Sequence, residues 1–220
     1  DLVVEGADLA REGLVPLAIA DLGYGGEKQH DIAALTWAST DEATADLVLR
    51  VLPASGEADL DATMMPFEIA QVSREEAAAA TAFGAIAAGD LDADGRDEIV
   101  VMRPLLGELD VDGMDASRSV ELAISIGTRE GGAVVFAEKA RLPPFTLSWD
   151  TIEDTEAGRV YASLALFGAE VVLVDIDGDG DLDVVVRIHA GGTTLYPFFL
   201  GPDGELVAGS LSLPEGERTT

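Results

Sequence analysis

The chain of 220 residues carries 42 aspartates and glutamates against 13 lysines and arginines, which gives a formal net charge of −29 at pH 7. Such a charge would repel a phosphate backbone and an anionic bilayer, so we expect no nucleic acid partner and no membrane insertion. A hydrophobic content of 48% indicates a folded chain, and the length allows one substantial β domain or two small ones. An acidic surface also suits a saline habitat, and the sequence does not decide whether this explains the excess of acids.

Composition excludes two common ways of cross-linking a fold. The sequence has no cysteine, so it has neither disulfides nor thiolate metal sites.

No apolar run is long enough to cross a bilayer. The chain begins at Asp1 without a signal-peptide pattern, and we expect this to be a processed or excerpted start.

The first group of predicted elements covers 14–71 and consists of four short apolar or β-branched runs. Turn-forming residues separate the runs, as is typical of antiparallel strands. The alanine-rich segment 74–80 that follows predicts one or two helical turns in a connection, because isolated helices of this length are marginal. The expected strands are 14–20, 31–37, 45–52 and 64–71.

A second group covers 83–138 and a third covers 169–211. The runs 99–102 and 184–186 are continuously apolar, which indicates strands buried on both faces between stacked sheets. An insertion over 141–168 separates the two groups, and long connections in β folds are often functional. The expected strands are 83–88, 98–103, 119–127 and 132–138 in the second group, and 169–175, 183–189, 193–200 and 204–211 in the third.

An internal repeat links the three groups. The segment AIAAGDLDADGRDEIVVMR at 85–103 aligns with EVVLVDIDGDGDLDVVVR at 170–187, since each has an apolar run, an acid-rich loop and a β-branched run. LAIADLGYGGEKQHDIAALTW at 17–37 is a fainter third copy. The copies are spaced more widely than the ~40–50 residues of common propeller blades, which leaves room for four strands in each. The predicted fold is therefore all-β, a single domain over 1–220 built as a β-propeller-like array of about three four-stranded antiparallel blades.

The acid-rich loops have the spacing of a site for a hard cation. In the loop 175–183, carboxylates stand at positions one, three, five, seven and nine. A tight loop around an ion turns alternate side chains inward, and Ca²⁺ takes six to eight oxygen ligands. Gly180 at position six permits the positive φ that such a curl needs. The candidate ligands of this loop are Asp175, Asp177, Asp179, Asp181 and Asp183.

The loop 90–98 repeats the scheme, with Gly95 in the place of Gly180. Arg96 at position seven can offer only its backbone carbonyl, and Asp181 is expected to do the same by analogy. Asp97 is then expected to point to solvent. The candidate ligands of this loop are Asp90, Asp92, Asp94, Arg96 and Glu98.

An EF-hand is the obvious rival for such loops. It requires a bidentate Glu at position twelve and a helix on either side. Position twelve is Val101 in one loop and Val186 in the other, and both flanks are β-branched. The EF-hand interpretation is therefore excluded.

The sequences GDLDADGRDEIVV and VDIDGDGDLDVVV resemble the calcium loops of the FG-GAP/VCBS repeat family, which also occurs in integrin α-subunit propellers and in many bacterial surface proteins. The resemblance covers both loops with their flanking strands closely and the third copy weakly. It implies a calcium-stiffened loop between the first and second strands of a blade, and an extracellular, cell-surface or periplasmic location. The side-chain ligands that it implies are Asp90, Asp92, Asp94 and Glu98 in one loop, and Asp175, Asp177, Asp179 and Asp183 in the other.

The first copy departs from this pattern. Asp21 stands at position one, but Gly23 and Gly25 occupy positions three and five, and Asp31 comes two residues late. We therefore expect no metal in the first copy and two Ca²⁺ per chain.

Three blades do not close a propeller, because known propellers have at least about four. Three possibilities are open: the chain belongs to a larger propeller, copies of it associate, or the insertion 141–168 supplies another blade.

Other constellations indicate structural roles. His30 lies in a loop and His189 continues a strand, so neither has a catalytic setting. The aromatic cluster around Pro197 could stack on a sugar, but aromatic residues on a blade strand usually belong to the core. No nucleophile-elbow motif occurs, so we expect the chain itself not to be an enzyme.

The sequence thus favours an extracytoplasmic calcium-binding repeat module that binds a protein or glycan partner, or takes part in assembly. Two alternatives are the propeller portion of a secreted polysaccharide-acting enzyme and a structural subunit that self-associates into an oligomer or filament.

Overall fold

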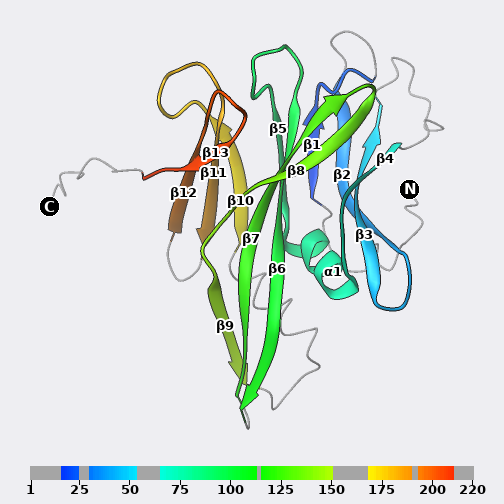
Figure 1. Ribbon diagram of the computed structural model, residues 1–220, viewed down its shortest axis with the longest axis vertical. Helices are drawn as coiled ribbons and strands as arrows, with labels where there is room; N and C mark the ends of the chain where they lie inside the picture. The colour runs from blue at the N-terminus through cyan, green and yellow to red at the C-terminus, as the bar shows by residue number, and fades with distance from the viewer. Residues whose placement is uncertain are drawn as a thin grey trace, which may run out of the picture.

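The computed structural model describes residues 16–24, 30–53, 65–112, 115–150, 168–189 and 193–210. Over these residues the chain forms three antiparallel sheets and one helix, so the all-β class is confirmed. The sheets lie side by side in chain order, with the second sheet in the middle (Figure 1).

The first sheet is a four-stranded meander, and a helix follows it directly. Its strands β1 (Leu17–Ala20), β2 (Asp31–Ser39), β3 (Thr44–Leu52) and β4 (Met65–Ser73) pair in that order. Helix α1 (Arg74–Phe83) begins with a capping box, in which the Ser73 hydroxyl accepts from the Glu76 amide and the Glu76 carboxylate accepts from the Ser73 amide. This cap satisfies two of the first amides of the helix, which is longer than the segment 74–80 expected from the sequence.

The second sheet contains one strand more than predicted. Its main path is β5 (Ala85–Gly89), β6 (Glu98–Asp112), β7 (Asp115–Glu130) and β8 (Ala133–Arg141). The additional strand β9 (Phe145–Asp150) pairs with β7 beyond the end of β8. The third sheet consists of β10 (Ala169–Val174), β11 (Asp183–His189), β12 (Thr193–Leu200) and β13 (Leu206–Ala208).

Strand β9 lies within the segment 141–168, which was predicted as an insertion. Residues 145–150 extend the second sheet instead of starting a further blade, and 151–167 lie outside the described residues. Together β6, β7 and β9 form an extension that projects beyond the other two sheets (Figure 1). It packs on the helix through a small cluster of Ala79, Val120 and Leu147. An ion pair between Arg118 and Glu75 ties the same two parts together.

The three sheets begin in the same way. In each, the first strand pairs with the second in one common register, so that Ala20 faces Asp31, Gly89 faces Glu98 and Val174 faces Asp183. The loops after β5 and β10 lie at the same end of the array (Figure 1). The first strands β1, β5 and β10 are also neighbours across the sheets, with β5 in contact with both of the others.

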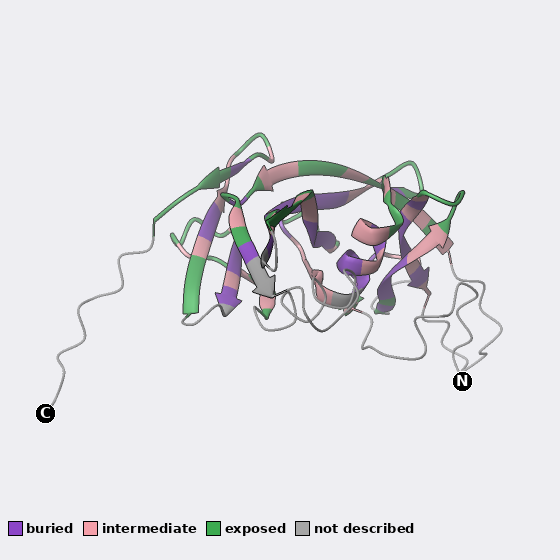
Figure 2. Ribbon diagram, turned by 90° about the horizontal axis from the view of Figure 1, so that it is seen from below, coloured by how far each residue is buried: buried purple, intermediate pink, exposed green. Residues whose placement is uncertain are grey.

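The core consists of two layers, one between each pair of neighbouring sheets. Strand β6 contributes to both: Val100 and Met102 pack toward the third sheet, whereas Ile99 and Val101 pack toward the first. All four side chains are fully buried, which confirms the expectation of strands covered on both faces. Buried residues, purple in Figure 2, are concentrated on the strands where two sheets face each other.

Candidate metal centre

Both acid-rich loops connect the first and second strands of a sheet. The loop after Gly89 joins β5 to β6, and the loop after Val174 joins β10 to β11. In each, the ninth position is the first residue of the second strand, Glu98 or Asp183, and its side chain is buried. The paired strands therefore fix both ends of the loop, and the register places the ninth residue beneath it.

Four hydrogen bonds in the first of these loops recur in the second. The first carboxylate accepts from the amide of position six, which is Gly95 to Asp90 at 2.9 Å and Gly180 to Asp175 at 3.2 Å. The amides of positions five and seven donate to the carboxylates of positions three and five in both loops. The ninth residue accepts from the amide of position two, at 2.8 Å in one loop and 2.9 Å in the other. Each carboxylate is thus held by a backbone amide.

Positive φ angles at positions four and six close the curl. Position six is Gly95 (φ 88°) or Gly180 (φ 102°), as the spacing predicted. Position four is Gly178 (φ 81°) in one loop but Ala93 (φ 57°) in the other, and Ala93 is the only residue with a side chain among the described ones to have a positive φ. This conformation costs about 1–2 kcal/mol for a residue with a Cβ, so the loop is retained at some expense of stability.

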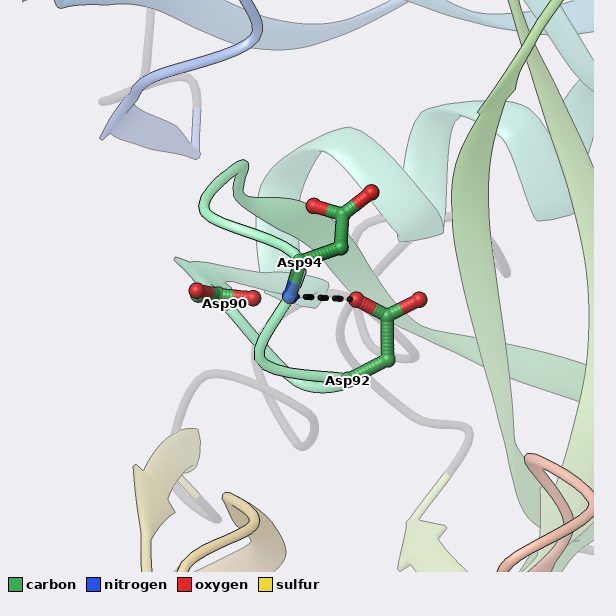
Figure 3. Close-up of side chains that lie close together, drawn as sticks. All are labelled: Asp90, Asp92 and Asp94. Carbon is green, nitrogen blue, oxygen red and sulfur yellow. Dashed lines mark hydrogen bonds between the residues drawn. The ribbon is translucent and has the colours of Figure 1, made fainter.

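The curl brings carboxylates together in both loops. Oxygens of Asp90, Asp92 and Asp94 lie within 4.8 Å of one another (Figure 3), and so do oxygens of Asp175, Asp177 and Asp183. In Figure 3 the Asp94 amide donates to Asp92, which holds the loop closed on one side of the group. Oxygens at such separations, from several side chains of one loop, are the ligand type that Ca²⁺ prefers.

One carboxylate oxygen of the first group is left without a partner. Asp90 Oδ2 accepts from Gly95, but Asp90 Oδ1 is buried and has no hydrogen-bond donor. Burying an unpaired oxygen of a charged group is costly, so such atoms require an explanation. A cation held among Asp90, Asp92 and Asp94 would supply the missing partner.

The pKa of Glu98 reflects its burial and the negative charge of the nearby aspartates. Burial raises the pKa of its carboxyl to about 7, the hydrogen bond from Leu91 opposes this, and repulsion from Asp92, Asp94 and Asp90 adds to it. The Glu98 carboxylate lies outside the group formed by Asp90, Asp92 and Asp94, so it would join that group only after a movement of its side chain. Without a cation, it holds a proton up to near-neutral pH.

The predicted ligand set of the third sheet is assembled in part. Asp183 is 2% exposed and accepts a second hydrogen bond, from the Leu200 amide at 3.0 Å, which locks its carboxylate under the loop. Asp179 accepts from the Asp181 amide and lies outside the group formed by Asp175, Asp177 and Asp183. Asp179 would complete the set only after its side chain turns inward.

The expectation that Asp97 points to solvent is wrong. Its carboxylate accepts from the Asp21 amide at 2.6 Å, and its own amide donates to the Asp21 carbonyl at 3.0 Å. Position eight of the other loop, Leu182, plays an equivalent part, because it packs against Gly89 of the second sheet. Position eight therefore joins each loop to the preceding sheet.

The first copy of the loop has a guanidinium group beside it. Arg129, on β7, donates to the Leu22 carbonyl at 2.8 Å and lies 4.5 Å from the centre of the Tyr24 ring. Its terminal nitrogen and the Arg96 side chain are also the nearest neighbours of Gly23. The Arg96 side chain thus extends toward the neighbouring loop, as expected of a residue that offers its own loop only a carbonyl.

Asp31 was interpreted from the sequence as displaced by two residues, and in space it is not. It is the first residue of β2, in the same register position as Glu98 and Asp183, and it accepts from the Tyr24 amide at 3.3 Å. The two additional residues lengthen the loop without moving its end. Residues 25–29 are outside the described part of the chain, so positions near Gly25 are not compared.

A cleft also opens between the second and third sheets, with a volume of about 680 Å³. Its walls combine prolines and two aromatic rings with one ion pair, Arg141 with Glu121. Tyr196 and Phe198 line it, and both also contribute to the core, as the sequence suggested for this aromatic cluster. No pattern in the sequence indicates the cleft, because its walls come from separate sheets.

No helix in the described part of the chain is long and apolar enough to cross a membrane. A scan of protein-family models, a search of curated proteins and a search of solved structures each return no match.

Proposed function

We propose that the chain binds two calcium ions, one in each acid-rich loop, and that the ions stiffen a propeller-like array of blades which acts by association. The observation that carries this proposal is the buried, unpartnered Asp90 Oδ1 within a group of three converging carboxylates. The matching hydrogen bonds of the other loop support a second site of the same kind.

The proposed ligand sets follow loop position. Positions one, three, five and nine would supply carboxylate oxygens, and position seven a backbone carbonyl. A flexible loop with this many oxygens suits Ca²⁺ better than Mg²⁺, which demands near-ideal octahedral geometry and keeps several waters. The two sets are Asp90, Asp92, Asp94, Arg96 and Glu98, and Asp175, Asp177, Asp179, Asp181 and Asp183.

A propeller-like arrangement of the sheets is part of the proposal. It is supported by the contacts of β5 with both β1 and β10. The common register between the first and second strands of all three sheets also supports it. In a propeller the first strands of the blades surround the central channel. The resemblance of the loops to FG-GAP/VCBS repeats leads to the same arrangement.

We further propose that the module works outside the cytoplasm and binds a protein or glycan partner. Extracellular calcium concentrations suit weak loops of this type, whose dissociation constants are about 10⁻⁴–10⁻³ M. The cleft beside Tyr196 offers an apolar wall with a few polar groups, which is the usual make-up of a small-ligand site. A glycan array probed with the calcium-loaded chain would identify such a partner.

Calorimetric titration of metal-stripped protein with CaCl₂ tests the calcium proposal. Wild-type chain should bind two ions, and Asp92→Asn or Asp177→Asn should each remove one. Asp110→Asn is the matched control, because Asp110 is exposed on the β6 extension, away from both loops. A stoichiometry of one or none, or a loss in the control as large as in the loop variants, would contradict the proposal.

A further inference from the structure

Each sheet has two faces, and the common register makes the faces comparable. We call the front face the one that carries the residues two and four positions before the loop, and the back face its opposite. The front face holds Leu17 and Ile19 in the first sheet, paired with Ala34 and Ile32 on the second strand. The corresponding front pairs are Ile86 with Val101 and Ala88 with Ile99 in the second sheet, and Val171 with Val186 and Leu173 with Val184 in the third.

Inside the chain, a front face always packs on the back face of the preceding sheet. The front residues Ile99 and Val101 of the second sheet share a core with Ala33 and Leu35, which are on the back of the first sheet. The front residues Val184 and Val186 of the third sheet share a core with Val100 and Met102, on the back of the second. The same rule thus produces both interfaces.

The contact between first strands shows how closely the faces approach. Gly89 lies on the back face of β5, and a Cβ there would come within 3.1 Å of the Leu173 side chain on the front of β10. There is therefore no space between the second and third sheets at this point.

Among the described residues, no neighbouring sheet covers two faces, the front of the first sheet and the back of the third. On the front of the first sheet, Leu17 is 60% exposed, Ile19 is 70% and Ile32 is 43%. On the back of the third sheet, Val172 is 45% exposed and Val174 is 42%. Leu195 and Val207, at 37% and 58%, lie on that same back face. Large apolar side chains exposed together on a β-sheet usually mark an interaction surface.

We propose that these two faces bind each other between copies of the chain, so that the back of the third sheet in one copy packs on the front of the first sheet in the next. The faces are the two halves of the interface that the chain already forms twice internally. By analogy with the Gly89–Leu173 contact, Val174 of one copy would face Ile19 of the next, and because Val174 is larger than Gly89 the two faces would lie farther apart at this point. The exposed ion pair of Arg187 with Glu170 would lie on the same face as Val172 and Val174, beside the apolar contact.

Such a contact is heterologous, because each copy offers a different surface to its two neighbours. Heterologous contacts give a ring if the rotation closes and an open filament if it does not. A dimer through two identical back faces would leave both front faces exposed. It would also differ from the front-to-back packing that the chain forms internally. The inference deepens the proposed association and rests on the propeller-like stacking, but calcium binding is not part of it.

Two variants with one blocked face each test the direction of assembly. Ile19→Glu places a charge on the front face and Val174→Glu on the back face. Wild-type chain at micromolar concentration should show a concentration-dependent mass above the monomer by light scattering. Each variant alone should be monomeric, and an equimolar mixture of the two should form dimers only, because one unblocked back meets one unblocked front.

Val111→Glu is the control, since Val111 is 56% exposed on the β6 extension and belongs to neither face. It should assemble like the wild type. Circular dichroism checks folding, and Ile19→Ser with Val174→Ser provides a milder pair if the glutamates unfold the chain. A monomeric wild type, or a mixture of variants that stays monomeric, would overturn the proposal. Association that survives Ile19→Glu but not Val174→Glu would show a back-to-back dimer and overturn it as well. Calcium titration of the same samples reports failure of the metal proposal separately.

Discussion

Replacing Asp90 with Asn should stabilise the chain in the absence of calcium and should lose most of that advantage when calcium is present. Asn keeps an oxygen acceptor for the Gly95 amide, so the loop retains its hydrogen bond. The substitution removes one negative charge whose oxygen lies within 4.8 Å of oxygens from Asp92 and Asp94. At that separation each like-charge pair costs at least about 0.9 kcal/mol even at the dielectric constant of water. In the absence of calcium, the free energy of unfolding of the variant should therefore be about 1–2 kcal/mol larger than that of the wild type.

Calcium should reduce this difference. At a dissociation constant of about 10⁻⁴–10⁻³ M, 1 mM calcium adds about 0.4–1.4 kcal/mol per site to the wild type. The variant loses this gain in the second sheet and keeps it in the third. Urea denaturation followed by tryptophan fluorescence, in EDTA and in 1 mM CaCl₂, measures both numbers, with Asp110→Asn as control. Equal destabilisation of Asp90→Asn in the two buffers would refute the idea that the carboxylates repel one another until a cation binds.

Three further predictions concern single residues of the loops. Because the pKa of Glu98 is raised to about 7 from an ordinary 4.5, the calcium-free chain should lose stability as pH rises from about 4.5 to 7. Glu98→Gln, which resembles the protonated carboxyl, should remove this pH dependence. Calcium uptake at pH 6.5 should accordingly release protons, seen as a buffer-dependent binding enthalpy that Glu98→Gln lacks. Ala93→Gly should stabilise the fold by about 0.5–1 kcal/mol by relieving its positive φ, and Gly178→Ala should have the opposite effect, both measured by urea denaturation. Arg129→Gln should lower the free energy of unfolding by about 1–3 kcal/mol, equally in EDTA and in calcium, because Arg129 donates to the Leu22 carbonyl of the loop in which no metal is expected. A loss of stability that depends on calcium would contradict this.

The sequence predicted the strands on either side of the acid-rich loops well, because their signals are local. Apolar runs on either side of an acid-rich loop determine where β5, β6, β10 and β11 lie, and glycine at position six determines the curl. The strand starting at Glu98 and the strand starting at Asp183 were both expected at those residues. These features depend on alternation, turn chemistry and spacing, which a single sequence displays.

Features that depend on contacts between distant residues were not predictable. The Asp97 side chain finds its partner in Asp21 of another sheet, and no spacing within its own loop indicates this. Asp31 was misjudged because positions counted along the chain ignore where the strand starts in space. The extension of β6 beyond residue 103 was not expected, because Gly107 interrupts its apolar positions and the pairing shifts register between Leu106 and Leu109. Pairing with β7 and the packing of Leu106 against the cluster on α1 stabilise it.

The burial of β6 on both faces has a consequence for how the chain folds. Neither core layer can form before this strand is in place, because residues 99–102 supply alternate side chains to the two layers. In the described part of the chain, the first and third sheets therefore each pack on the middle one. We expect the middle sheet to be the folding nucleus, and core truncations on β6 to slow folding more than equivalent truncations in β3 or β12. Unfolding should be a single cooperative step, and a weakened β6 should uncouple the end sheets into separate transitions.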